Sequence, residues 1–190
     1  MATLPTPLPR RTAAAVRPAA SLASIAVLLL LAGCGGDNGE KFAPPCPTVA
    51  ILRDAADLTR YRGAGRDLTD SVVDGRITGV NGSCKRDGAD TVVTTVQVGM
   101  DLTRGPAAPG REATVAYFVA VLDGERILDK QVFQLRAVFP ANADRLRLSG
   151  DDVELRLPVT PKKTAAAYRI QVGFQLSPVE LEVNRKRGRR

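Results

Sequence analysis

The sequence predicts an all-β protein: an antiparallel β-sandwich of the immunoglobulin-like kind, with about seven or eight strands and a short C-terminal helix. Two observations predict this class. Segments in which apolar and polar residues alternate recur along residues 46–184, and turn-forming residues separate them. The loops between these segments are uneven in length, which favours a sandwich over the alternative, a small barrel of the lipocalin type.

The first part of the folded region is expected to hold three strands. Residues 48–52 form a short first strand, whereas residues 54–71, rich in aspartate, arginine and glycine, are expected to be loop or single turns. In residues 72–84 the apolar positions change parity at Gly79, which is typical of a strand with a β-bulge. Residues 92–102 alternate with period two, which predicts a half-buried strand.

The second part begins with a predicted hairpin. Residues 114–122 are apolar on both faces, so this strand is expected in the middle of a sheet. Asp123-Gly124 separates it from the next apolar segment, 127–139, and this dipeptide favours the two-residue turn of a β-hairpin.

Shorter strands and a helix complete the predicted order. Alternation indicates strands around residues 146–148, 153–157 and 168–176. Tyr168, placed about ten residues after the end of the preceding strand, resembles the tyrosine corner of immunoglobulin-like domains. The sequence Ser177-Pro178-Val179-Glu180 combines a capping serine, a proline at the first helical position and a glutamate at the third. It therefore predicts a helix beginning at Pro178.

The N-terminal residues have the three parts of an export signal. Three arginines precede the apolar run 25–30, and small residues follow it. The segment ends in Leu31-Ala32-Gly33-Cys34, which resembles the lipobox of bacterial lipoproteins at all four positions. That resemblance implies a diacylglyceryl thioether on Cys34, cleavage before it and acylation of the new amino terminus. The alternative is an ordinary secretory signal that ends near a cysteine.

A permanent transmembrane helix is disfavoured here, because the apolar segment 19–33 is shorter than the roughly 20 residues that a spanning helix needs. The expected organisation is therefore a signal peptide (1–33), a flexible glycine-rich tether (34–45), the β-sandwich domain (46–184) and a basic tail (185–190). In the resembling family, glycine rather than aspartate after the lipidated cysteine implies the periplasmic face of the outer membrane.

The assignment of Cys34 to the lipid predicts the state of the two remaining cysteines. Once Cys34 carries lipid, Cys46 and Cys84 are the only pair left in an oxidising compartment, so a Cys46–Cys84 disulfide is predicted. An unpaired or metal-bound state is the alternative, although two thiols without any histidine are a poor metal site.

The net charge of +7 is concentrated at the two ends of the chain, and residues 34–184 are close to neutral. This distribution lacks the basic face with interleaved aromatic residues that nucleic-acid binding requires, so no nucleic-acid partner is expected. The tail is a candidate contact for anionic lipid or an acidic envelope protein, and its alternative role is to aid solubility. Its cations are Arg185, Lys186, Arg187, Arg189 and Arg190.

No catalytic motif is evident. The absence of histidine excludes the common Ser-His and Cys-His mechanisms, and the aspartates lie in turn-like segments without a calcium-loop pattern. We therefore expect no cofactor and no enzymatic activity. The expected function is that of a lipid-anchored envelope module that binds a partner or has a structural role; the alternative is a periplasmic carrier of a small apolar ligand or lipid.

Overall fold

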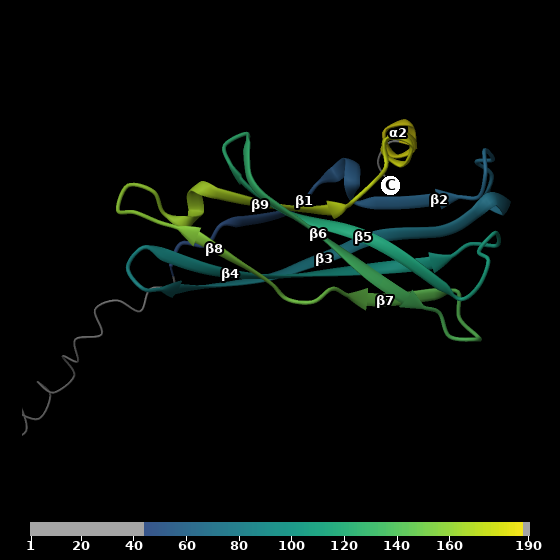
Figure 1. Cartoon of the computed structure of the whole chain (residues 1–190), viewed down its shortest axis with the longest axis horizontal. Helices are drawn as coiled ribbons and strands as arrows, with labels where there is room; N and C mark the ends of the chain where they lie inside the picture. Colours follow the sequence, from purple (N-terminus) through teal and green to yellow (C-terminus); the bar gives the residue numbers. More distant parts are fainter. Residues whose placement is uncertain (1–43, 188–190) are drawn as a thin grey trace, which may run out of the picture. The chain divides into compact units, whose positions relative to one another are not determined.

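The computed structural model describes residues 44–187, which form nine strands and one C-terminal helix arranged as two facing β-sheets (Figure 1). Sheet A has the strand order β1-β9-β5-β6, and sheet B has the order β2-β3-β4, with β7 and β8 both pairing along β4. The predicted β-sandwich is confirmed, with nine strands instead of seven or eight. The strands are β1 (Thr48–Ile51), β2 (Asp57–Tyr61), β3 (Ser71–Asp87), β4 (Thr91–Arg104), β5 (Glu112–Asp123), β6 (Arg126–Val138), β7 (Arg145–Ser149), β8 (Val153–Pro158) and β9 (Tyr168–Phe174).

The additional strand is β2, in a segment expected to be loop. After β1, which runs parallel to β9, the single turn η1 (Arg53–Ala55) carries the chain to sheet B, where β2 pairs antiparallel with β3. Polar cross-strand contacts fix β2: Arg76 pairs with Asp57 at 2.8 Å, and the Thr59 hydroxyl donates to Asp74 at 2.8 Å. The prediction that residues 54–71 hold no strand was wrong, because the residues that pair with β2 lie on β3 and no pattern within residues 54–71 reveals them.

The predicted bulge is confirmed. The β3–β4 pairing shifts register between Ile77 and Gly79, where the apolar positions change parity. β4 has the predicted alternation, and β5 lies between β9 and β6, as its two apolar faces indicate. The longest central strands are therefore set by hydrophobic period and burial.

The β5–β6 hairpin is confirmed with its turn displaced by one residue. Asp123 pairs with Arg126, so the two loop residues are Gly124 and Glu125. Gly124 has φ +60°, a conformation that glycine adopts without a steric penalty. The glycine thus occupies the first loop position, and the aspartate ends the strand.

Two local motifs hold the C-terminal part. The Tyr168 hydroxyl donates to the carbonyl of Pro158 at 2.7 Å, the hydrogen bond that the tyrosine-corner resemblance predicts. The three consecutive strands β2, β3 and β4 share one sheet, which no three consecutive strands of an immunoglobulin constant-type domain do. The sandwich is thus shared with that class, but the strand order is not.

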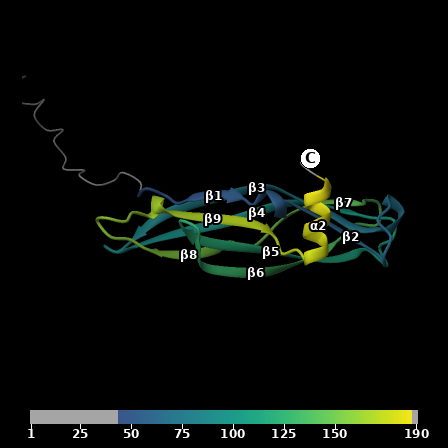
Figure 2. The ribbon, with the colours of Figure 1, turned by 90° about the horizontal axis from the view of Figure 1, so that it is seen from above.

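Helix α2 (Pro178–Arg187) begins at the predicted residue. The Glu180 amide donates to the Ser177 hydroxyl at 3.3 Å, and the Ser177 amide donates to the Glu180 carboxylate at 2.7 Å. This reciprocal pair satisfies two amides that a helix start leaves without partners. α2 lies across the strand direction, near β2 (Figure 2).

The core between the sheets is almost completely shielded from solvent, and the largest of its fully buried side chains are Tyr117, Phe139, Phe174, Leu58, Met100 and Leu102.

Phe174→Ala is expected to lower the free energy of unfolding by about 3–5 kcal/mol, because it leaves a cavity that this core cannot fill. Phe133→Ala, at a half-buried position on β6, should cost about half as much. Urea denaturation followed by circular dichroism measures both, and equal losses would contradict this assignment of the core.

Candidate binding surface

The edge of β6 is the most exposed apolar feature of the described residues. β6 borders sheet A on the side opposite β1, and β5 is its only strand partner there (Figure 2). Four of the seven large apolar side chains found exposed in residues 44–187 lie on this strand. They are Ile127, Leu128, Val132 and Val138, exposed by 58%, 43%, 50% and 55%. An edge of this length presents unpaired backbone groups beside apolar side chains.

The cations of β6 are held against the neighbouring strand. The Lys130 ammonium lies 4.6 Å from the centroid of the Phe118 ring, and Arg136 pairs with Glu112 at 2.6 Å; both partners are on β5. Charged side chains on an edge normally discourage pairing with another strand. Because these two are drawn toward β5, the outer border of β6 is left less protected by charge.

The inward side of β6 is also only partly covered. Phe133 stacks on the buried Tyr117 at a centroid distance of 5.3 Å, and Phe133 and Leu135 pack against the core while remaining half-buried. Both sides of the strand therefore offer apolar contact area, and a rigid core residue supports it from behind. The sequence predicted this strand but not its position at the edge, since that position depends on which strands pair.

The outer face of sheet B differs from this edge because it carries a row of paired charges. Asp57, Arg76, Asp101 and Arg147 lie in one row across four strands, with alternating sign. The hydrogen bond from Arg147 lowers the pKa of Asp101 below its ordinary value, and the one to Asp57 raises the pKa of Arg76. This row of charges is mutually satisfied, and it contributes little as a binding site.

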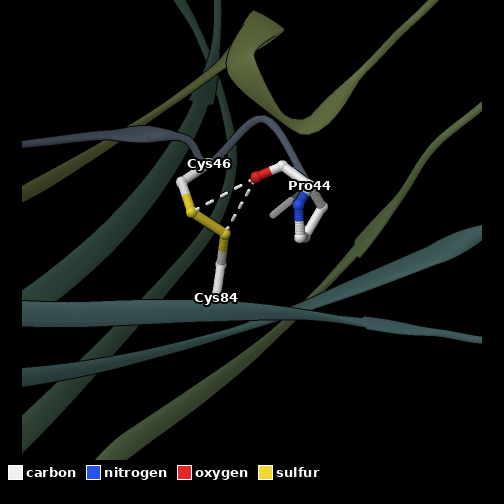
Figure 3. Close-up of a disulfide and its surroundings, with 3 residues drawn as sticks. All are labelled: Pro44, Cys46 and Cys84. Atoms are coloured by element: carbon white, nitrogen blue, oxygen red, sulfur yellow. Dashed lines mark hydrogen bonds between the residues drawn. A yellow bond between two sulfur atoms is a disulfide. The ribbon is translucent and has the colours of Figure 1, made fainter. Parts of the chain in front are cut away.

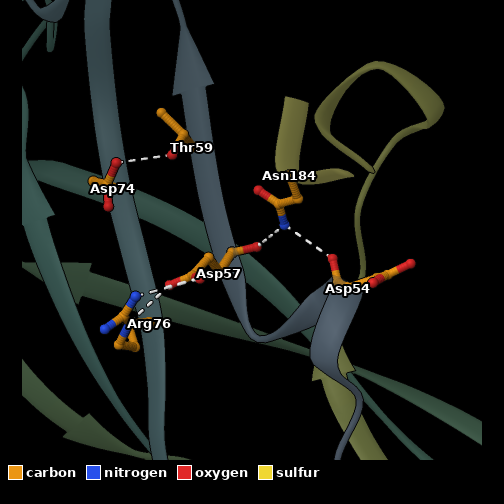
Figure 4. A network of polar contacts seen from close by, with 6 residues as sticks. All are labelled: Asp54, Asp57, Thr59, Asp74, Arg76 and Asn184. Carbon is orange, nitrogen blue, oxygen red and sulfur yellow. Dashed lines mark hydrogen bonds and ion pairs between the residues drawn. The ribbon is translucent and has the colours of Figure 1, made fainter. Parts of the chain in front are cut away.

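A polar network fixes α2 to the start of sheet B (Figure 4). The Asn184 amide donates to the backbone carbonyls of Asp54 and Asp57, at 3.0 and 2.6 Å, and Arg60 pairs with Glu180 at 3.1 Å. No sequence pattern pointed to Asn184, because its acceptors are backbone groups more than a hundred residues away.

Two of the cations near the C-terminus form ion pairs within the domain. Arg185 pairs with Asp54 at 3.1 Å, and Lys186 pairs with Glu182 at 2.7 Å, so two of the five candidate contact residues have acidic partners. The side chains of Arg187, Arg189 and Arg190 lie outside the described part of the chain. The membrane contact expected for this segment remains a prediction.

Cys46 and Cys84 form the predicted disulfide (Figure 3). It joins the residue two positions before β1 to β3, with 5.8 Å between the Cα atoms, and the carbonyl oxygen of Pro44 lies 3.6 Å from each sulfur. Cys46 is exposed and Cys84 half-buried. Cys34, the predicted lipidation site, lies outside the described residues.

Two surface pockets of residues 44–187 lie outside the space between the sheets. One, of about 180 Å³, lies between β2 and α2 beside Arg60 and Glu180. The other, of about 210 Å³, lies between the tip of the β3–β4 hairpin and the β8–β9 loop. Within residues 44–187, no group of three or more acidic or cysteine side chains is placed to hold a metal ion.

Comparison of the chain with protein-family models, curated proteins and solved structures found no match. In the described part of the chain, no helix has both the length and the apolar character needed to cross a bilayer. The fold and the surface thus define a two-sheet β-sandwich with one open, apolar edge strand.

Proposed function

We propose that this protein is a lipid-anchored lipoprotein of the bacterial cell envelope whose β-sandwich is a non-enzymatic binding module. The exposed apolar edge of β6 carries this proposal. Its backbone groups accept an extended segment of a partner protein as an additional strand, and side chains such as Val132 and Phe133 contact that segment on either side.

The lipid anchor supplies the other half of the mechanism. A domain confined to a membrane meets partners in the same membrane at a high effective concentration, so a modest edge contact is sufficient. The lipobox at Leu31-Ala32-Gly33-Cys34 supports the anchor, and the Cys46–Cys84 disulfide supports an oxidising compartment. By its resemblance to lipoproteins with glycine after the lipidated cysteine, we place the protein at the periplasmic face of the outer membrane.

The packing between the sheets favours binding of a partner over carriage of a ligand. A carrier encloses most of its ligand in an apolar cavity of several hundred cubic ångströms. Both pockets here are smaller and open at the surface, and fully buried side chains occupy the space between the sheets.

The proposal is tested by photocrosslinking in cells. A crosslinking amino acid at Gln134, on the exposed face of β6, is expected to give a discrete adduct with an envelope protein. Val132→Lys should reduce that adduct on the order of tenfold, because it places a charge where the added strand packs. Leu68→Lys is the matched control, since it makes the same change at an 87% exposed position away from β6, and should leave the adduct unchanged.

The anchor is tested in the same assay. Cys34→Ser should weaken the adduct, because the soluble form loses its confinement. An adduct that is equally strong in Val132→Lys would contradict the β6 contact, and an adduct with twice the mass of the chain would identify the partner as a second copy.

A further inference from the structure

The chain enters the β-sandwich at one end of the sheets, and we call this the proximal end. It is formed by Pro45, the tip of the β3–β4 hairpin and the β8–β9 loop; Figure 1 shows the latter two segments together on the left. The disulfide fixes the incoming chain to β3 directly beside this tip. Whatever precedes Pro44 is therefore attached at this end of the domain.

The proximal end carries cations that the fold leaves free. Lys85, Arg86 and Lys162 are exposed, and none of them has an acidic partner among residues 44–187. Asp90, at the same hairpin tip, offsets part of their charge and accepts a hydrogen bond from the Thr91 hydroxyl.

The neighbouring charges, in contrast, are occupied. Arg156 pairs with Asp87 at 2.6 Å, and Lys163 pairs with Asp123 at 2.7 Å. The hydrogen bond from Lys163 lowers the pKa of Asp123, so this acid remains charged and bound to its own partner. The three free cations are thus a local excess, and nearby carboxylates do not neutralise them all.

One of the free cations lines a hollow, and a second follows a lining residue in sequence. Arg86 and Pro161 both line the pocket of about 210 Å³, and Lys162 follows Pro161 directly. The floor of this pocket includes the core residues Val92 and Ala165. The proximal end thus places positive charge beside a small, partly apolar hollow.

We propose that the proximal end rests on the anionic phospholipid headgroups of the membrane to which the protein is anchored. This inference rests on the lipid anchor of the proposed function. A glycine-rich segment of the length between Cys34 and Pro44 has a root-mean-square span of about 15–20 Å, so it holds this end close to the bilayer surface. The free cations then meet the negative surface potential within a few Debye lengths.

The contact orients the domain. Each cation near an anionic surface changes the equilibrium constant between the membrane-contacting and the free orientation by about fivefold. Because Asp90 offsets part of this effect, the three cations together favour the contacting orientation by at least about tenfold. In this orientation the proximal end faces the lipid, and β6 extends along the domain away from it (Figure 1). The edge then stays accessible to a partner.

The test replaces the native anchor, so that it does not depend on lipidation. The compact unit Phe42–Arg190 contains all nine strands, α2 and the disulfide. Residues 35–190 are prepared with an N-terminal hexahistidine tag, which is the only nickel ligand because the chain has no histidine. The protein is bound to vesicles of nickel-chelating lipid in phosphatidylcholine, with or without phosphatidylglycerol.

Energy transfer from a dye on the domain to a headgroup acceptor reports the orientation. Dyes are placed on Ala89→Cys, at the proximal end, and on Ala141→Cys, in the β6–β7 loop. Phosphatidylglycerol is expected to raise energy transfer from the first position and not from the second. The triple variant K85Q/R86Q/K162Q lowers the equilibrium constant for contact by about tenfold and should therefore remove most of that rise.

A matched triple variant removes the same charge elsewhere. Arg53, Arg111 and Arg145 are exposed and form no ion pair within the described residues, so R53Q/R111Q/R145Q is expected to keep the rise. An equal loss in both triple variants, or no effect of phosphatidylglycerol, would overturn the proposal. Because the tag supplies the anchor, either result is independent of whether Cys34 carries lipid.

Discussion

Cys34→Ser is expected to abolish incorporation of labelled fatty acid and to move the protein from the membrane fraction to an unprocessed or soluble form. The resemblance to lipoproteins implies at least two acyl chains at this position, and each buried methylene contributes about 0.8 kcal/mol. A single chain binds only marginally, whereas two or more hold a protein stably. The loss of attachment should therefore be nearly complete, which makes it the largest effect expected of any substitution in this chain.

The chain provides its own control for this result. Cys46→Ser removes one of the other two cysteines and breaks the disulfide, yet it should leave the label and the membrane attachment in place. Metabolic labelling followed by fractionation measures both variants. A labelled, membrane-bound Cys34→Ser protein would disprove the anchor, and with it the confinement on which the proposed function depends.

Local signals predicted the elements that local chemistry determines. The change of parity at Gly79 marks a real register shift, the Ser177–Glu180 pair caps a real helix, and Tyr168 makes the backbone hydrogen bond that its position suggested. Each of these depends on residues within about ten positions of one another, or on the hydrophobic period of a single strand.

The features that depend on topology could not be predicted in this way. β2 is short and polar, and its contacts with Asp74 and Arg76 exist only once β3 lies beside it. The strand β6 was visible in the sequence, but its exposure follows from its place at the end of sheet A. Two free cations of the proximal end, Lys85 and Arg86, are adjacent in sequence, and only the fold brings the β8–β9 loop, which carries Lys162, to the pocket that Arg86 lines.

Among substitutions outside the core, removal of the disulfide is expected to lower the stability of the domain the most. Cys46 and Cys84 are separated by 38 residues, and in the chain-entropy model a loop of this length restrains the unfolded state by about 4 kcal/mol. C46S/C84S should lower the free energy of unfolding by roughly that amount, measured by urea denaturation without reductant. The wild-type protein in reductant should unfold at nearly the same urea concentration as the double variant.

The same bond has a second role that this variant can separate from stability. Cys84 directly precedes Lys85 and Arg86, so the disulfide links the incoming chain to the strand that presents two of the three free cations. If the proximal end contacts lipid as a rigid unit, C46S/C84S should weaken the phosphatidylglycerol response even under conditions where the domain remains folded. An undiminished response would mean that strand pairing alone, between β3 and β4 and between β4 and β8, holds the hairpin tip in place. In the urea experiment, a loss of stability below about 1 kcal/mol would contradict the loop-entropy account.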